Sequence, residues 1–128
     1  DDSIGRGTSS VRVVRMVREA GAAEVHLRSA SPPIQWPDYY GIDMPDREHL
    51  LAANHSTEEI AKILGVDSMG YLSVDGLYWA MDAERDPANP QFTDHYFTGD
   101  YPTRLLDREI AEGRNDADER QLSFLVDA

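Results

Sequence analysis

The chain opens on two adjacent carboxylates, Asp1 and Asp2, which lead into a loop of glycines and hydroxyls and then into a helical pattern. Gly5 and Gly7 allow a backbone to approach a ligand closely, and residues 8–10 offer hydroxyls and amides where a helix begins. A helix N-terminus carries roughly half a positive charge, which favours phosphate. Carboxylates accept hydrogen bonds from sugar hydroxyls and, one or two at a time, hold hydrated Mg2+. The segment therefore predicts a site for a metal-bound sugar phosphate.

Helical and extended patterns alternate after this loop. The first pattern predicts a helix that ends at Gly21, and its apolar side consists of Val13, Val14, Met16, Val17 and Ala20. A strand over 24–28 comes next, because Val25 and Leu27 alternate with polar side chains, and the Ser-Pro-Pro run at 31–33 ends it. This order of elements favours an α/β fold.

Shorter elements are expected in the middle of the chain. In order, they are a helix over 46–53, a helix opened by the capping box at 56–59 and ended by Gly65, a strand over 69–73, a helix capped by Asp75 that runs to about Met81, and a polar loop over 82–90.

The composition of the chain limits the classes of protein to which it can belong. With 128 residues and 41% apolar content the chain can form one ordinary domain, and no apolar run approaches the length that spans a membrane. A formal net charge of -12 argues against nucleic acid as a partner. The absence of cysteine and of a signal sequence leads us to expect a cytoplasmic protein.

Histidines and aromatic residues do not form a pattern of their own. The histidines lack the spacing of a metal site and are expected to be surface or structural residues: His26, His49, His55 and His95. The aromatics are expected in the core or at an interface rather than as a base-stacking set: Trp36, Tyr39, Tyr40, Tyr71, Tyr78 and Trp79.

The opening run, Asp-Asp-Ser-Ile-x-Arg-Gly-Thr-x-Ser, resembles the phosphoribosyl pyrophosphate motif of type I phosphoribosyltransferases, in the form found in the amidophosphoribosyltransferase family. Successive blocks along nearly the whole chain resemble the same family, in the same order: residues 18–22, 24–28, 30–33, 40–45, 67–68, 71–73, 75–77, 97–102 and 121–125.

The resemblance implies a fold and an activity. The fold is part of a type I phosphoribosyltransferase domain, with parallel αβ units after the motif and a helical C-terminal layer over 1–102, and a polar, flexible tail over 103–128. The activity is transfer of glutamine-derived ammonia to 5-phosphoribosyl pyrophosphate, which gives 5-phosphoribosylamine in the first step of purine synthesis. Family members carry a glutaminase domain upstream, so we expect this chain to be a C-terminal piece that is inactive alone.

The resemblance also assigns the site, with no catalytic residue among these positions. Ribose and 5-phosphate binding falls to Asp1, Asp2, Ser3, Arg6, Gly7, Thr8 and Ser9, and Mg2+ binding to Asp1 and Asp2. On its residue type alone, Arg6 is as well explained as a solvated loop arginine. The implied partners are phosphoribosyl pyrophosphate, purine nucleotides as inhibitors, and further copies in a homo-oligomer, with neither nucleic acid nor membrane among them.

Two departures from the family pattern stand out. Some members hold an iron-sulfur cluster on cysteines, and the matching positions here are Asp38, Thr93 and Tyr96, so a cluster of that type is excluded. Gly5 replaces the small branched residue that the family usually has, which loosens the loop.

Two other interpretations stay open. The chain could be a non-catalytic module that binds phosphoribosyl pyrophosphate or purine nucleotides, or a structural fragment that folds poorly without the strands it lacks. Within the tail, an apolar knob at 122–126 is expected to dock on the body or on another subunit.

Overall fold

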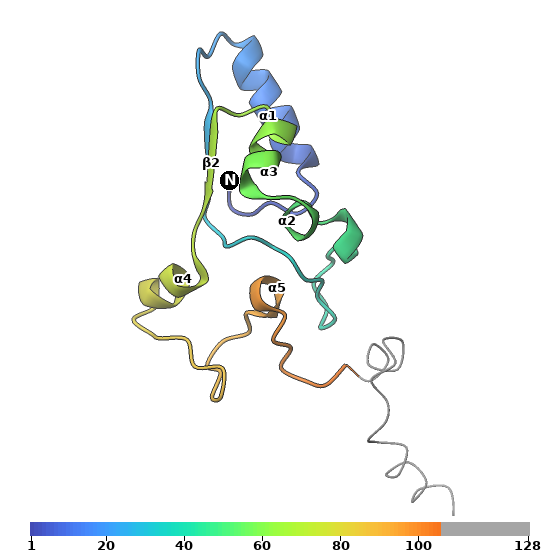
Figure 1. The fold of residues 1–128 in the computed structure, drawn as a ribbon, viewed down its shortest axis with the longest axis vertical. Coiled ribbons are helices and arrows are strands. Elements are labelled where there is room, and N and C mark those ends of the chain that lie inside the picture. The colour runs from blue at the N-terminus through green and yellow to red at the C-terminus, as the bar shows by residue number, and fades with distance from the viewer. Residues whose placement is uncertain (106–128) are drawn as a thin grey trace, which may run out of the picture.

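The computed structural model describes residues 1–105 as an α/β fold (Figure 1). The expectations for the tail beyond residue 105 and for its apolar knob at 122–126 lie outside the described residues. In chain order the elements are α1 (Thr8–Glu19), β1 (His26–Ser29), the 3-10 helix η1 (Arg47–His49), α2 (Leu51–Asn54), α3 (Thr57–Leu64), β2 (Ser68–Tyr71), α4 (Val74–Ala80) and α5 (His95–Thr98).

Strands β1 and β2 form a parallel pair, as the sequence predicts, with His26 opposite Ser68 and the C-terminal end of β1 opposite Tyr71. Asp1 adds a parallel bridge on the other edge of β1. Its backbone ammonium nitrogen donates to the carbonyl of Arg28 at 3.1 Å, and its carbonyl accepts from the N–H of Ala30 at 2.9 Å. The first residue of the chain therefore lies at the carboxyl end of β1.

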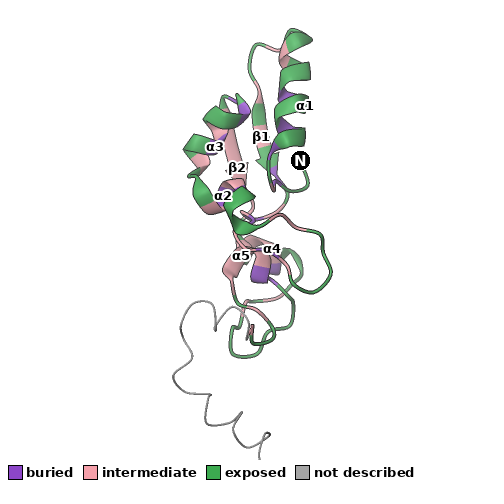
Figure 2. Cartoon of the chain, turned by 90° about the vertical axis from the view of Figure 1, so that its right-hand side faces the viewer, coloured by how far each residue is buried: buried purple, intermediate pink, exposed green. Residues whose placement is uncertain are grey.

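The main core lies between the sheet and helices α1 and α3 (Figure 2), and it consists of Ile4, Val14, Ala52, Ile60, Leu64 and Val66. Helix α3 begins as predicted, because Ser56 and Glu59 form both hydrogen bonds of a capping box. It ends at Gly65, which adopts a left-handed conformation with φ 74°.

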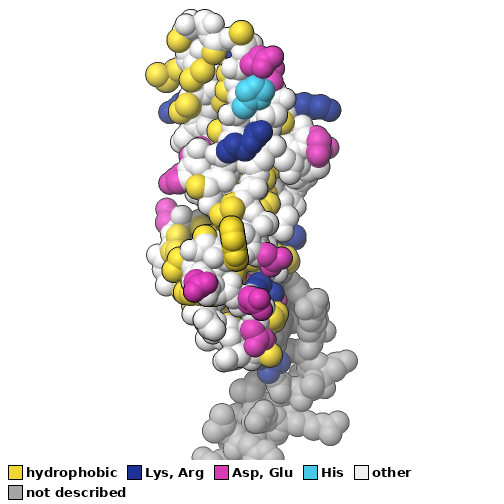
Figure 3. Space-filling model, turned by 90° about the vertical axis from the view of Figure 1, so that its left-hand side faces the viewer, with side chains coloured by type: hydrophobic (Ala, Val, Ile, Leu, Met, Phe, Trp, Pro, Cys, Tyr) yellow, Lys and Arg dark blue, Asp and Glu magenta, His cyan; other side chains and the backbone are white. Residues whose placement is uncertain are grey.

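The expected helix at the start of the chain is present, but most of its apolar side is exposed. Only Ser10 and Val14 of α1 are buried. Met16 is 67% exposed and Val13 58%. Helix α1 packs chiefly on α3, so only a narrow strip of its surface meets the core. The end of the molecule that holds α1 carries exposed hydrophobic side chains in Figure 3.

Other expected boundaries need correction. The helix over 46–53 is divided into η1 and α2, because Leu50 between them is extended, with φ -81° and ψ 122°. Helix α4 is capped by Ser73 rather than Asp75, since the Ser73 hydroxyl accepts the N–H of Gly76 at 2.9 Å. Helix α5 was not expected. It is one short turn that ends at Gly99, which is left-handed with φ 78°.

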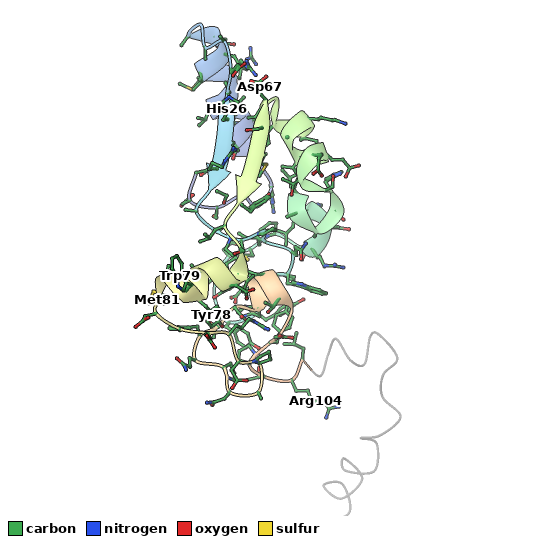
Figure 4. All side chains as sticks on the ribbon, turned by 60° about the vertical axis from the view of Figure 1, so that its left-hand side comes forward. His26, Asp67, Tyr78, Trp79, Met81 and Arg104 are labelled. Atoms are coloured by element: carbon green, nitrogen blue, oxygen red, sulfur yellow. The ribbon has the colours of Figure 1, made fainter. Side chains whose placement is uncertain are left out.

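The aromatic residues of α4 face opposite ways. Tyr78 is 4% exposed, as expected for a core residue, whereas Trp79 is 83% exposed and points away from the body (Figure 4). Trp79 is therefore not part of the core. Among the helices of residues 1–105, none combines the length and the apolar character that a membrane span requires.

Candidate functional site

A hollow of about 200 Å³ lies at the start of the chain and is lined by residues 1–10 alone. Asp1 is hydrogen-bonded to the carboxyl end of β1, so the hollow lies between this end of the strand and the N-terminus of α1. The structure thus brings all seven predicted site residues together. Six of them are exposed and one, Gly7, is buried: Asp1, Asp2, Ser3, Arg6, Thr8 and Ser9 form the exposed set.

The Asp1 carboxylate is oriented by the first turn of α1. The buried hydroxyl of Ser10 donates to Oδ2 of Asp1 at 2.7 Å. This bond and the backbone bridge to β1 fix both ends of Asp1. The sequence pattern predicts Ser10 as a hydroxyl and amide donor of the phosphate loop, but only the fold shows that its hydroxyl reaches back nine residues to Asp1.

The Asp2 carboxylate is held locally, since its Oδ1 accepts the N–H of Ser3 at 2.7 Å. Within the described part of the chain, one carboxylate oxygen of Asp1 and one of Asp2 accept hydrogen bonds. The second oxygen of each carboxylate is therefore available to a ligand. Within residues 1–105 no group of three or more His, Cys, Asp or Glu could hold a metal ion. Two carboxylates fit Mg2+, which completes its shell with water and substrate phosphate.

The N-terminus of α1 offers donors to an anion. Gly7 is the N-cap, in a left-handed conformation with φ 76°, and no side chain caps the helix. The first-turn amides of a helix have no acceptor within it, so those of Thr8, Ser9 and Ser10 are available to a phosphate. The exposed hydroxyls of Thr8 and Ser9 lie beside them. Arg6 is exposed at the rim, which fits a phosphate contact and a solvated arginine equally well.

Helix α2 forms the floor under this loop. The N–H of Leu51 donates to the carbonyl of Gly5 at 3.0 Å. A side chain at Gly7 would collide with Cδ1 of Leu51 and come within 3.2 Å of Leu64. Ile4, which is 1% exposed, anchors the loop in the core. Sequence reasoning missed Leu51, because nothing in its local pattern shows contact with residues more than forty positions earlier.

A second polar cluster joins α4 to α5. Arg85 binds Asp94 at 2.6 Å and also pairs with Asp100, while the Tyr78 hydroxyl donates to Asp94 at 2.9 Å. Burial raises the pKa of Asp94, but the bonds from Arg85, Tyr78 and Thr98 outweigh it and hold the pKa below its usual value. Because Arg85 pairs with both carboxylates and Tyr78 also binds Asp94, we interpret this cluster as structural.

The two segments that hold the positions matching cluster cysteines in some members of the resembled family are joined by a hydrogen bond. Asp38 accepts a 2.7 Å hydrogen bond from His95, which stands between Thr93 and Tyr96 in the chain. A hydrogen-bonded acid and histidine thus link the same segments. As expected for a structural histidine, His95 is buried.

Comparison with curated proteins gives consistent relatives, although no family model matches the chain. Amidophosphoribosyltransferase of Rhizobium etli is 62% identical over 110 residues, which cover 84% of this chain and 22% of that protein. Amidophosphoribosyltransferase of Bacillus subtilis is 49% identical over 105 residues, or 82% of this chain and 22% of that protein.

Solved structures give the same result. Glutamine phosphoribosylpyrophosphate amidotransferase from B. subtilis, in complex with ADP and GMP, matches with a TM-score of 0.73 and 48% identity, over 82% of this chain and 23% of that one. A structure described as the allosteric regulatory enzyme of purine biosynthesis matches with a TM-score of 0.68 and 44% identity. The chain thus spans between 22% and 23% of the length of these relatives.

Proposed function

Because this chain belongs to the amidophosphoribosyltransferase family, we propose that it is a segment of such an enzyme and contributes the ribose and 5-phosphate part of its substrate site. The hollow formed by residues 1–10 supports this proposal, since carboxylates, hydroxyls and free helix amides converge there. The substrate it fits is 5-phosphoribosyl pyrophosphate. The observation that carries the proposal is the Asp1 carboxylate, which Ser10 holds beside the N-terminus of α1.

The 5-phosphate would lie on the first turn of α1. The amides of Thr8, Ser9 and Ser10 donate to its oxygens, and the dipole of a twelve-residue helix favours its charge. This local donor set is important because a chain with a net charge of -12 otherwise repels an anionic substrate.

The carboxylates of Asp1 and Asp2 would accept the ribose hydroxyls and hold the ring in place while ammonia replaces pyrophosphate at C1 with inversion. Positive charge develops on the ring in this step, and fixed carboxylates beside it stabilise that charge without attacking the carbon. Bound Mg2+ would supply charge neutralisation at the pyrophosphate. Positioning of this kind contributes about 7 to 11 kcal/mol when the geometry is good.

The remaining functions belong to the whole enzyme. The resemblance implies a cysteine nucleophile in the glutaminase domain, and these 128 residues contain no cysteine, so ammonia would come from outside this chain. Purine nucleotides are proposed as inhibitors, because the B. subtilis relative was solved with ADP and GMP. A homo-oligomer is proposed from the resemblance alone.

Calorimetric titration of the chain with phosphoribosyl pyrophosphate and Mg2+ tests the site. We expect saturable binding that Asp1→Asn and Asp2→Asn each weaken, because both lose a charged acceptor. Asp43→Asn is the matched control, since Asp43 is exposed and lies outside the hollow. A folded chain that binds no substrate, or equal weakening by all three variants, contradicts the proposal.

A non-catalytic binding module is the second candidate. It is favoured by one observation, namely that residues 1–10 provide the whole lining of the hollow. Ammonia-dependent formation of phosphoribosylamine, measured on the enzyme that contains this segment, separates the two candidates. Substrate binding without any turnover by the enzyme that contains this segment would favour the module.

A further inference from the structure

We propose that Leu51 is a positioning residue for the phosphate loop of residues 4–7, which it holds in its binding conformation from beneath. The proposal rests on the function proposed above, and it extends the site to α2. Leu51 touches the loop in two independent ways, through its backbone and through its side chain.

The backbone contact fixes the middle of the loop. The N–H of Leu51 stands at the start of α2, where a helix leaves its first amides without internal acceptors, and it donates to the carbonyl of Gly5 at 3.0 Å. This contact turns that carbonyl toward α2 and away from the hollow. The carbonyl of Gly5 therefore does not present a partial negative charge to a bound phosphate.

The side-chain contact fixes the end of the loop. Cδ1 of Leu51 occupies the space where a Cβ at Gly7 would lie, and Cδ2 of Leu64 lines the other side at 3.2 Å from that position. Gly7 therefore packs directly against Leu51. Since Gly7 is the N-cap of α1, this packing sets where the first-turn amides begin.

Leu51 is itself held in place by polar side chains around α2. The side-chain amide of Asn54 donates to the carbonyls of Arg47, Glu48 and Leu50, at 3.0, 3.1 and 2.8 Å. The side-chain amide of Gln35 donates to the carbonyl of Ala52 at 3.2 Å. Both neighbours of Leu51 are thereby anchored, so α2 is a firm support rather than a mobile one.

The loop needs such a support because two of its four residues are glycines, which have the largest conformational freedom. A loop that samples many conformations binds more weakly, in proportion to the fraction of time spent in the competent one. If Leu51 restrains the loop, its truncation should lower affinity by loosening the loop and not merely by destabilising the fold.

The experiment compares Leu51→Ala with Leu50→Ala in the full chain. Leu50 is the matched control, because it is the adjacent leucine, is only 1% exposed, and contributes none of the three atoms nearest to a Cβ at Gly7. Leu51→Val serves if the alanine variant does not fold, and Leu51→Met tests rescue by a side chain of similar volume.

Two quantities are measured on each variant. Amide hydrogen exchange at residue 11, whose N–H donates to Gly7, and at residue 51 reports the loop, and exchange at Ile60 in α3 reports the rest of the fold. Calorimetry with ribose 5-phosphate reports affinity. For Leu51→Ala we expect exchange at 11 and 51 to accelerate about tenfold relative to Ile60, and Kd to rise about tenfold.

Leu50→Ala should lower overall stability but leave the exchange ratio and Kd within about threefold of the original chain, and Leu51→Met should restore both. Equal loosening of the loop by Leu50→Ala and Leu51→Ala overturns the proposal. If the unaltered chain does not bind ribose 5-phosphate, the proposed function is wrong, and the exchange ratio alone decides the role of Leu51.

Discussion

His95 and Asp38 lie 57 positions apart and are joined by a 2.7 Å hydrogen bond between side chains that are each 1% exposed. The other oxygen of Asp38 accepts the amides of Tyr40 and Ile42, at 2.9 and 2.7 Å. The rings of Tyr40 and Tyr101 pack on His95, with centroids 5.2 and 5.1 Å away. A buried acid and its donors thus fasten α5 to the segment before η1, where no cysteine is available to do so.

This link should make stability depend on acid. Burial raises the pKa of Asp38, but the amides of Ile42 and Tyr40 and the His95 ring outweigh it and hold the pKa below its usual value. The folded chain therefore binds fewer protons than the unfolded one. The stabilisation is complete above the unfolded pKa of about 3.9 and is lost as pH falls through the lower folded pKa.

Urea unfolding at pH 7, 5, 4 and 3 checks this dependence. Asp38→Asn should flatten the fall in unfolding free energy below about pH 4, because the variant has no carboxylate to protonate. Asp43→Asn, an exposed acid a few residues away, should keep the full decline. Identical curves for the two variants would show that Asp38 does not carry the effect.

Removal of the charge at Asp94 should destabilise the fold. Asp94→Asn weakens the bonds from Arg85 and Tyr78, and a hydrogen bond to a charged group contributes about 1.5 to 3 kcal/mol. We expect a loss of about 2 to 3 kcal/mol in chemical denaturation. Asp82→Asn is the control, since Asp82 is exposed with φ 54°, a conformation that asparagine tolerates. Equal losses would contradict the prediction.

Gly99→Ala should cost more stability than Gly65→Ala. Both glycines end helices in the left-handed conformation, with φ 78° and 74°, so alanine is strained at either position by about 1 to 2 kcal/mol. At Gly99 alone, a Cβ would also come within 2.8 Å of Trp36, whereas Gly65 faces open space. Unfolding midpoints of the two variants isolate this contact. Equal midpoint shifts would mean that the ring moves aside without cost.

Gly5→Ala should stabilise the loop of residues 4–7, which is expected to be loose because Gly5 replaces a small branched residue of the family pattern. Gly5 is not in a left-handed conformation, and a Cβ there meets nothing within 4 Å. Alanine then reduces unfolded-state freedom, which is worth about 0.4 to 1 kcal/mol. Gly7→Ala should do the opposite, because φ is 76° and the Cβ collides with Leu51. Thermal unfolding of both variants gives the sign of each effect, and a destabilising Gly5→Ala would refute the argument.

The residues of the candidate site, the family resemblance and the αβ order are all predicted from the amino-acid sequence alone. These features depend on neighbouring residues: the Asp1–Ser10 run is contiguous, the capping box at 56–59 spans four positions, and the β1 alternation is local. Each of these features is predicted without knowledge of which distant residues pack against it. The boundaries of helices are predicted less accurately, because the extended Leu50 divides one expected helix and Ser73 rather than Asp75 caps α4.

The distant residues that support the site are identified only in the folded molecule. The bond from Ser10 to Asp1, the contacts of Leu51 under the loop and the Asp38–His95 pair all join positions that the chain brings together by folding. The exposure of Met16 on an amphipathic helix is of the same kind. A periodic pattern shows which side of a helix is apolar, but the burial of that side depends on what packs against it.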